Sequence, residues 1–397
     1  MNWTTRLQQI TATLLTASLI SVVGWGASAS PAQALAAPAP TPQQGCSTGD
    51  HGLLKDLQKA HQGAEAQPLA FSDVEFLSAD TGRAAGNGFL IGTSDGGCHF
   101  QKIYEGQWNF RQMDFPDNVH GWALAAVNDG PANYLIRTAD GGSTWTRLSN
   151  KAVTFESVEF LDSSKGFGYN RASTYYTNDG GESWSLIKTP ANTRGAYFTS
   201  RNSGWAVVIM PGSGYQVMRT ADGGANWKQM LKVPYASPNY GRLYANGSQV
   251  YAVLYGDYGM SQTSYSLYGS SNAGVSWTRV IAQETAGGGP APGSGAATVK
   301  KGPASGTPGN MVLIGKTTAF LAGYQPAAEE VGVGLTKNNG RTWSNQKAVP
   351  GFEGVISFTD HNRGWLAARD LNSSTLYVTK DAGATWTARF SFEHTGQ

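Results

Sequence analysis

The stretch Thr138-Ala-Asp140-Gly-Gly142-Ser-Thr144-Trp145 decides the fold of this chain. Asp140 can accept hydrogen bonds from the backbone N–H groups that follow it, which is the chemistry of an Asx turn. Gly142 supplies a positive φ at little cost. Trp145 stands at the start of a strand and can lie back over the turn, burying its ring. The octapeptide therefore predicts a tight turn that leads into a strand.

The same pattern occurs seven times, counting one degenerate copy. That first copy, Thr93 to Phe100, ends in Phe instead of Trp and contains Cys98. Two copies have Asn at the acidic position, which keeps the acceptor oxygen and the turn preference. The acidic-position residues are Asp95, Asp140, Asp179, Asp222, Asn272, Asn338 and Asp381, and the closing tryptophans are Trp145, Trp184, Trp227, Trp277, Trp343 and Trp386. Such regular recurrence indicates a structural role for these residues.

A second element precedes most copies: an apolar strand, a polar turn, then Gly and an aromatic residue. Phe115 to Trp122 and Phe358 to Trp365 are examples. Each unit then spells four short strands over about 40–45 residues, which is the signature of a propeller blade. We therefore expect an all-β fold, a seven-bladed β-propeller over residues 71–392, with each turn between strands three and four of its blade. A solenoid of stacked sheets is the alternative.

One interval between copies is longer than the others. Residues 282–310 are rich in Gly, Ala and Pro and account for the extra length. This composition predicts a flexible insertion.

Composition supports strands and turns and excludes several function classes. The 397 residues include 51 Gly, 12 Trp and 17 Tyr, and only 14% are charged. The formal net charge of +2 does not indicate a nucleic-acid-binding protein. The histidines lack metal-ligand spacing and no phosphate-binding glycine loop is present. We therefore expect no metal, no cofactor and no catalytic residues.

The N-terminus reads as an export signal. Arg6 precedes an apolar run from Ile10 to Val23, and small residues follow, with cleavage expected after Ala34. An uncleaved anchor is the alternative. After cleavage of residues 1–34 we expect a secreted or cell-envelope protein without a membrane span. Residues 35–70 predict an Ala/Pro-rich linker and a short helix.

The chain has two cysteines, Cys46 and Cys98. In an exported protein an even number favours a disulfide, which here would tie the segment after the signal to the first repeat as a latch. Two free thiols are the alternative. A lipoprotein would need Cys46 in a lipobox, and Gln43 and Gln44 do not fit one.

The repeated Ser/Thr-x-Asp-x-Gly-x-Thr/Ser-Trp turn resembles the Asp-box, or bacterial neuraminidase repeat, over roughly residues 71–390. With the Gly-Trp strands and the count of seven, the chain most resembles propellers of the photosystem II stability/assembly factor type. The resemblance implies an exported, non-catalytic assembly scaffold that binds another envelope or secreted protein. It also implies that Asp-boxes are structural turns remote from any active site. Sialidases are less similar, because no Arg-Ile-Pro strand occurs.

Candidate binding residues fall in two groups. Tyr251, Tyr255 and Tyr258 belong to a tyrosine-rich fifth repeat that could offer an aromatic platform to a protein or a glycan; ordinary strand filling is the alternative. Arginines of the third to fifth repeats could form a basic patch for an acidic partner segment, and scattered surface charge is the alternative. These arginines are Arg194, Arg201 and Arg242, with Arg171 beside them.

The end of the ring opposite the Asp-boxes is where we expect recognition. Loops between strands two and three lie there and carry acids that could serve a glycosidase. The rival function is therefore a glycan-directed propeller, either a lectin-like binder or a sialidase-like glycoside hydrolase. The loop acids are Asp129, Asp257, Glu329, Glu330 and Asp370.

Overall fold

The structure is a computed structural model that describes residues 46, 52–60, 68–128, 130–149, 151, 153–259, 262–303 and 306–393. The expected export signal and the linker up to residue 45 lie outside these residues. The first described element is α1 (Leu53–Ala60), and the described residues after it form strands, turns and loops apart from η1 (Pro326–Ala328).

The strands form six antiparallel sheets in chain order. The first sheet contains β1 (Phe71–Phe76), β2 (Gly82–Thr93), β3 (Gln101–Asp114), β4 (Gly121–Val127), β5 (Tyr134–Thr138) and β6 (Thr146–Arg147). The second contains β7 (Ser157–Phe160), β8 (Gly166–Tyr169), β9 (Thr174–Thr177) and β10 (Ser185–Ile187). The third contains β11 (Thr193–Phe198), β12 (Gly204–Met210), β13 (Gly214–Thr220) and β14 (Lys228–Pro234).

The remaining three sheets continue this order. The fourth contains β15 (Gly241–Asn246), β16 (Gln249–Gly259), β17 (Gln262–Ser270) and β18 (Thr278–Gln283). The fifth contains β19 (Thr307–Ile314), β20 (Thr318–Gln325), β21 (Glu330–Thr336), β22 (Ser344–Asn345) and β23 (Val349–Pro350). The sixth contains β24 (Glu353–Phe358), β25 (Gly364–Arg369), β26 (Ser373–Thr379) and β27 (Thr387–Glu393).

The described part of the chain is an all-β propeller, as expected, but it has six blades and not seven. The reason is β3, a 14-residue strand. Its first half pairs with β2 and its second half pairs with β4. The last strand of the first repeat therefore runs directly into the first strand of the second repeat. Two sequence repeats share one six-stranded sheet, which no count of turn motifs reveals.

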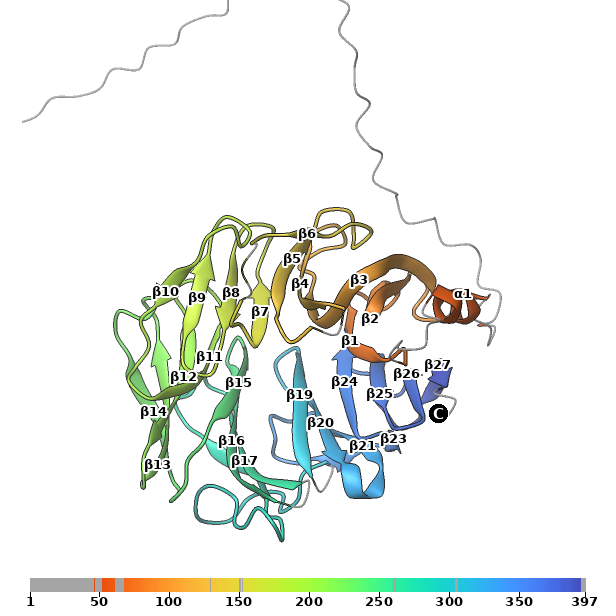
Figure 1. Cartoon of the computed structure of the whole chain (residues 1–397). Coiled ribbons are helices and arrows are strands. Elements are labelled where there is room, and N and C mark those ends of the chain that lie inside the picture. Colours follow the sequence, from red (N-terminus) through yellow and green to blue (C-terminus); the bar gives the residue numbers. More distant parts are fainter. Residues whose placement is uncertain are drawn as a thin grey trace, which may run out of the picture. The chain divides into compact units, whose positions relative to one another are not determined.

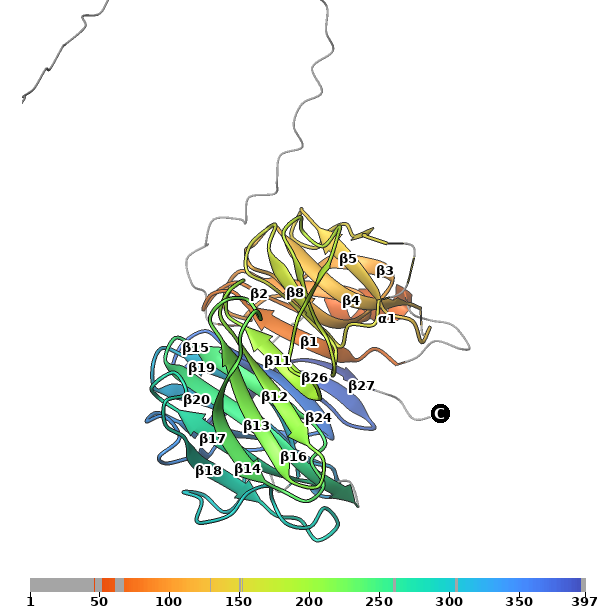
Figure 2. The ribbon, with the colours of Figure 1, turned by 90° about the vertical axis from the view of Figure 1, so that its left-hand side faces the viewer.

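The sheets stand around a common axis, with the first strand of each repeat innermost (Figure 1). Turned by 90°, β11, β12, β13 and β14 lie side by side as one antiparallel sheet (Figure 2). Because strands alternate in direction, the turns from strand one to two and from strand three to four lie at the same end of a blade.

Each Asp-box forms the same set of hydrogen bonds. In the second repeat the Thr138 hydroxyl donates to Asp140 (2.7 Å) and accepts from the Gly142 N–H (2.9 Å), while the Thr144 N–H donates to Asp140 (2.9 Å). The bonds from the glycine N–H and from the N–H four residues after the acidic position recur in all seven copies. Gly142 has a φ of 100°, which explains the glycine at this position.

The residue before that glycine connects the Asp-box to its own blade by a backbone hydrogen bond. The Gly141 N–H donates to the Val119 carbonyl (2.9 Å), in the turn that connects strands one and two. The equivalent bond occurs in all seven repeats, from the N–H groups of Gly96, Gly141, Gly180, Gly223, Ala273, Asn339 and Ala382. These seven residues all have positive φ, between 54° and 74°. The last three are not glycine and hold that conformation against its steric cost.

The Gly-aromatic pair has two separate tasks. The ring of Phe160 lies over Gly166 of its own blade, where any side chain on the glycine would overlap the ring. The same ring stacks on Trp122 of the preceding repeat, with centroids 3.7 Å apart. Phe358 on Phe320 (3.6 Å) and Phe76 on Trp365 (3.4 Å) repeat the stack. The glycine leaves space for the phenylalanine of its own repeat, and the aromatic residue stacks against the phenylalanine of the next repeat.

The insertion expected over residues 282–310 lies against the fifth repeat. Its ends belong to β18 and β19, and the described residues between them are bonded to the fifth repeat. Arg279 donates to the Ser266 hydroxyl (3.1 Å) and to the carbonyls of Ala291 (3.0 Å) and Gly295 (3.1 Å). A guanidinium with five donors can satisfy several loop carbonyls at once, which composition alone does not show.

Candidate functional site

Two candidate arginines lie on adjacent strands at the end of the ring opposite the Asp-boxes. Arg194 stands near the start of β11 and Arg242 near the start of β15, the innermost strands of neighbouring blades. The two strands approach closely, because a methyl group on Gly195 would overlap the carbonyl of Gly241. Gly195 has a φ of 132°, so both its conformation and its lack of a side chain are required there. This contact brings the strands that carry Arg194 and Arg242 together.

A third arginine joins them through tyrosine. The guanidinium carbon of Arg171 lies 5.1 Å from the centroid of the Tyr240 ring, a cation–π distance. Tyr240 stacks on Tyr255, with centroids 4.1 Å apart and an interplanar angle of 14°. Burial raises the pKa of Tyr240, and the charges of Arg242 and Arg171 oppose that rise. We call Arg171, Arg194, Arg242 and Tyr240 the arginine patch.

A cavity of about 530 Å³ opens at the same end. Tyr324 connects it with the arginine patch, because Tyr324 lines the cavity and its hydroxyl lies within electrostatic reach of Arg242. Arg111 and Arg369 add two cations, and Arg369 forms an ion pair with Glu353. The lining residues are Pro68, Ala70, Phe71, Ser72, Asn87, Asn109, Phe110, Arg111, Ala126, Asn128, Tyr324, Glu353, Gly354, Val355, Ala367 and Arg369.

Farther along the innermost strands, acids replace the arginines. Asp73 accepts from the Met113 N–H (2.7 Å) and Glu75 accepts from the Phe115 N–H (3.0 Å), each bond crossing to the next repeat. Asp114 accepts from the Phe160 N–H in the same way, and Glu159 accepts from the Tyr197 hydroxyl (2.9 Å). The inner edge of a sheet otherwise leaves its N–H groups unpaired. These half-buried acids therefore join successive repeats, within the first sheet for Asp73 and Glu75 and between neighbouring blades for Asp114 and Glu159.

Burial makes these carboxyl groups weak acids. It raises the pKa of Asp73 to about 7 and that of Glu159 to about 7, against the opposing effect of their hydrogen bonds. It raises the pKa of Glu75 to about 8, to which the nearby charge of Asp73 contributes. The pKa of Asp114 rises by burial and by its neighbours Glu75 and Glu159. We call Asp73, Glu75, Asp114 and Glu159 the acid ladder.

The sequence did not single out the acid ladder, although a signal was present. Glu75, Asp114 and Glu159 each directly precede the phenylalanine that ends strand one of their repeat. In the last repeat that position is Ser357, whose hydroxyl accepts from the Phe76 N–H (3.0 Å). Aligning the repeats on this phenylalanine would have exposed the polar position beside it.

The expected tyrosine platform is not formed by all of its members. Tyr251 and Tyr255 are buried, at 0% and 1% exposure, within the core between the fourth and fifth sheets. Only Tyr258 is open to solvent, at 79% exposure. The sheet position of β16 explains the correction, because this strand is covered on both faces and its tyrosines fill the core. Tyr258 stands at the hairpin end of this strand.

Arg201 does not belong to the arginine patch. It lies in the turn between β11 and β12, at the Asp-box end, and donates to the carbonyl of Gly223 in the fourth Asp-box (3.2 Å). Its guanidinium carbon also lies 5.1 Å from the Tyr176 ring. Arg194 and Arg201 are on the same strand–turn unit, but six residues of strand carry them to opposite ends of the blade.

The loop acids have dissimilar surroundings. Asp370 caps its own turn, accepting from the N–H groups of Asn372 (2.7 Å) and Ser373 (2.6 Å). Asp257 lies 3.4 Å from the Tyr235 hydroxyl. Glu329 occupies a positive-φ position after η1, and Glu330 begins β21. Asp129 lies outside the described residues.

Two kinds of site are absent from the described residues. They contain no group of three or more His, Cys, Asp or Glu side chains placed to hold a metal ion. In the same part of the chain, no helix has the length and apolar character needed to cross a membrane.

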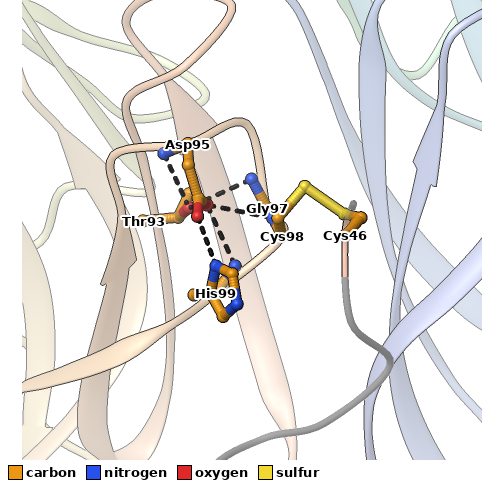
Figure 3. The surroundings of a disulfide bond; sticks show 6 residues. All are labelled: Cys46, Thr93, Asp95, Gly97, Cys98 and His99. Carbon is orange, nitrogen blue, oxygen red and sulfur yellow. Dashed lines mark hydrogen bonds and ion pairs between the residues drawn. A yellow bond between two sulfur atoms is a disulfide. The ribbon is translucent and has the colours of Figure 1, made fainter. Parts of the chain in front are cut away.

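Cys46 and Cys98 form a disulfide, with their Cα atoms 5.0 Å apart (Figure 3). The sulfur of Cys46 is therefore engaged in a bond that excludes the thioether of a lipid-modified cysteine.

The model of the BNR/Asp-box repeat matches residues 175–186, which contain the third box. The Photosystem II assembly lipoprotein Ycf48 of Synechococcus sp. (strain CC9902) is 27% identical over 181 residues, covering 43% of this chain and 51% of that protein. This chain thus spans about half the length of that curated relative.

Two solved structures share the fold. YCF48 bound to D1 peptide has a TM-score of 0.50 at 15% identity, covering 79% of this chain and 94% of that one. YCF48 from Cyanidioschyzon merolae has a TM-score of 0.51 at 14% identity, covering 79% and 96%. At these identities the likeness shows the fold alone. The chain is thus a β-propeller built from Asp-box repeats, similar in fold to the Ycf48 assembly proteins.

Proposed function

We propose that this protein is an exported, non-catalytic β-propeller that holds an acidic segment of a partner protein at the arginine patch. The observation that carries the proposal is the grouping of Arg171 and Arg242 around Tyr240, with Arg194 on the adjacent innermost strand, at the end of the ring where a cavity opens. Guanidinium groups bind carboxylates in a bidentate geometry that an ammonium does not offer.

The rim of the same end supplies apolar contacts. Tyr258, near the end of β16, is 79% exposed, and Leu371, in the turn that follows β25, is 75% exposed. Aromatic and arginine side chains dominate the energetics of protein interfaces. A combination of cations, an open tyrosine and an exposed leucine suits a peptide better than a sugar alone.

The comparisons support a protein partner. One of the solved structures of similar fold is described as bound to a D1 peptide, and the curated relative is described as an assembly protein. By analogy we propose an assembly role here, with a partner in the envelope or secreted. The Asp-boxes then act as fasteners of the ring, since their hydrogen-bonding groups are used within the turn.

Export is part of the proposal. A disulfide between Cys46 and Cys98 fits an oxidising compartment. The curated relative is named a lipoprotein, whereas the Cys46 sulfur of this chain is bonded to Cys98. We therefore propose a secreted or envelope protein that is not held by a lipid on Cys46.

A peptide titration tests the proposed function. The probe is a fluorescein-labelled twelve-residue peptide of alternating Glu and Ala, and its Gln-for-Glu counterpart is the probe control. The R194A/R242A variant should weaken binding of the Glu peptide at least tenfold, which corresponds to about 1.4 kcal/mol. R201A is the matched control, because that arginine lies at the other end of the blade. Equal weakening by R201A, or equal binding of the two peptides, would refute the proposal.

A further inference from the structure

The ring closes at a joint between its first and last sheets, where no described strand is shared. There β1 lies beside β24 and β25 (Figure 1). Phe76 stacks on Trp365 at 3.4 Å, and the Phe71 N–H donates to the Ser374 hydroxyl (2.9 Å). The closing joint therefore depends on side-chain packing and single hydrogen bonds, and not on a backbone ladder.

The cavity lies across this joint, at the end of the ring that carries the arginine patch. Its walls come from β1, β2 and β3 on one side and from β24 and β25 on the other. Four lining residues are small, which leaves the space open: Ala70, Ala126, Gly354 and Ala367. Its volume of about 530 Å³ falls in the range of small-molecule sites. A group placed in the cavity therefore contacts both sides of the closing joint.

Each side of the joint contributes one arginine to the cavity. Arg111 belongs to β3 and Arg369 ends β25, and both side chains are exposed. Arg111 donates to the Gly130 carbonyl (3.2 Å), and a guanidinium has five N–H donors, so this one bond does not exhaust it. Guanidinium groups bind carboxylates strongly, through parallel hydrogen bonds. A carboxylate in the cavity therefore has a cationic partner on each side of the joint.

One of these arginines already has an acidic partner. Glu353 forms an ion pair with Arg369, and both residues line the cavity. Their side chains are 55% and 50% exposed, and ion pairs this exposed contribute little to stability. A carboxylate from a partner protein can therefore replace Glu353 on Arg369 at small cost, and Glu353 competes with it.

Tyr324 connects the cavity with the arginine patch. Its hydroxyl donates to the carbonyl of Gly354, a cavity residue (2.7 Å). Burial raises the pKa of Tyr324 to about 12; the charge of Arg242 opposes this rise and the charge of Glu353 adds to it. Tyr324 is thus within electrostatic reach of the patch on one side and of the Glu353–Arg369 pair on the other.

We infer that Arg111 and Arg369 extend the binding site for the acidic segment across the closing joint, and that Glu353 is an internal competitor for Arg369. The inference rests on the proposed function and deepens it. The arginine patch holds one carboxylate of the segment. A second carboxylate enters the cavity, replaces Glu353 on Arg369 and meets Arg111. The bound segment then contacts the first and last sheets together and holds the ring closed.

Titration of the full chain with the labelled Glu–Ala peptide at low ionic strength tests the inference. R111A/R369A should weaken binding at least fivefold. E353Q should tighten binding at least threefold, because the competitor loses its charge and keeps its shape. E182Q is the matched control, since Glu182 pairs with Arg137 (3.1 Å) at the Asp-box end and the net charge changes equally; its affinity should equal that of the wild-type protein.

Each part of the inference has its own contrary result. Unchanged affinity in R111A/R369A would overturn the extension of the site. Unchanged affinity in E353Q, or equal tightening by E182Q, would overturn the role of Glu353.

Amide hydrogen exchange tests the contact across the joint. Saturating peptide should slow exchange in residues 71–76 and 373–376 at least threefold, because the bond between Phe71 and Ser374 crosses the joint. The strands β13 and β14 should stay unchanged. The R111A/R369A variant should lose this protection at saturating peptide. Exchange at residues 71–76 that ignores the bound peptide would overturn the bridging of the two sheets.

These outcomes separate the inference from the proposed function. Binding that is lost in R194A/R242A and kept in R111A/R369A would support the patch and overturn the inference. Binding that is lost only in R111A/R369A would refute the patch and leave the cavity as the site. A wild-type protein that does not bind the peptide would refute both.

Discussion

Phe160 of β7 lies flat on Trp122 of β4, with ring centroids 3.7 Å apart and an interplanar angle of 7°. The two residues belong to successive repeats, and Trp122 is fully buried. Its indole N–H donates to the carbonyl of Gly180 in the third Asp-box (2.8 Å). One side chain thus joins the stack between blades to the turn of the next repeat.

Truncating this tryptophan should cost much of the stability of the ring. W122A leaves a large cavity and an unpaired carbonyl, and we expect a loss of about 3–5 kcal/mol in the free energy of unfolding. Urea denaturation followed by far-UV circular dichroism measures it. W184A is the matched control, because Trp184 closes an Asp-box and is only half-buried; its loss should be smaller. A larger loss for W184A would contradict the importance given to the stack.

The Asp-box should tolerate Asn better than Ala. D140A removes the acceptor of the Thr144 N–H and of both threonine hydroxyls, and by analogy with a lost helix cap it should cost about 0.5–2 kcal/mol. D140N should cost less, because Asn272 accepts the same backbone bond in the fifth box. Thermal unfolding of both variants decides this. Equal losses would show that charge matters more than the bond.

Three boxes carry a conformational strain that glycine would relieve. Ala382 has a φ of 61° where Gly141 stands in the second box. The left-handed conformation costs an L-residue about 1–2 kcal/mol. Glycine avoids this cost, but it also makes the unfolded chain more flexible, and this offsets part of the stabilisation. A382G should therefore stabilise the protein by about 0.5–1 kcal/mol in urea denaturation. The reverse change, G141A, should destabilise it, and a loss in A382G would contradict the argument.

The acid ladder predicts that stability falls as pH rises. Burial raises the pKa of Asp73 to about 7 and that of Glu75 to about 8, from ordinary values of 3.8 and 4.5. Between these limits the folded state binds more protons than the unfolded state, so the free energy of unfolding decreases with pH. This contribution is complete below about pH 4 and is lost as pH passes through 7 to 8. Arg83, near Glu75, and the acids Asp114 and Glu159 share this environment.

Denaturation at pH 5 and pH 8 checks this sign. The wild-type protein should need less urea at pH 8. The D73N/E75Q variant keeps groups that accept hydrogen bonds but cannot ionise, and its midpoint should depend less on pH. A wild-type midpoint that rises from pH 5 to pH 8 would refute the assignment.

The sequence predicted the structure of a single blade well but did not predict the number of blades. Local bonds define the box, so Asp140 and Gly142 could be assigned from eight residues. The sharing of β3 by two repeats depends on whether strand four of one repeat ends before strand one of the next begins. No turn motif marks that boundary between residues 101 and 114, so seven boxes suggested seven blades.

Side-chain direction explains the mixed outcome for the site. Arg194 and Arg201 are close in sequence, but a strand separates them, and only Arg194 lies at the same end of the ring as Arg242. Tyr255 looked like a surface residue in a tyrosine-rich repeat and lies in the core instead, below Tyr240. The close contact of Gly195 with Gly241 is made by two strands from different blades. The sequence of either strand alone therefore does not predict it.

Phe76, Phe160 and Phe358 each lie over the glycine of their own repeat and stack on the aromatic residue of the previous repeat, and this contact between neighbours does not depend on the number of repeats. Phe76 makes it with Trp365 across the closing joint just as Phe160 does with Trp122 inside the chain. A repeat gained or lost by unequal recombination would present the same faces to its new neighbours. Ring size in such a protein is therefore open to evolution, while the joint between any two blades is not.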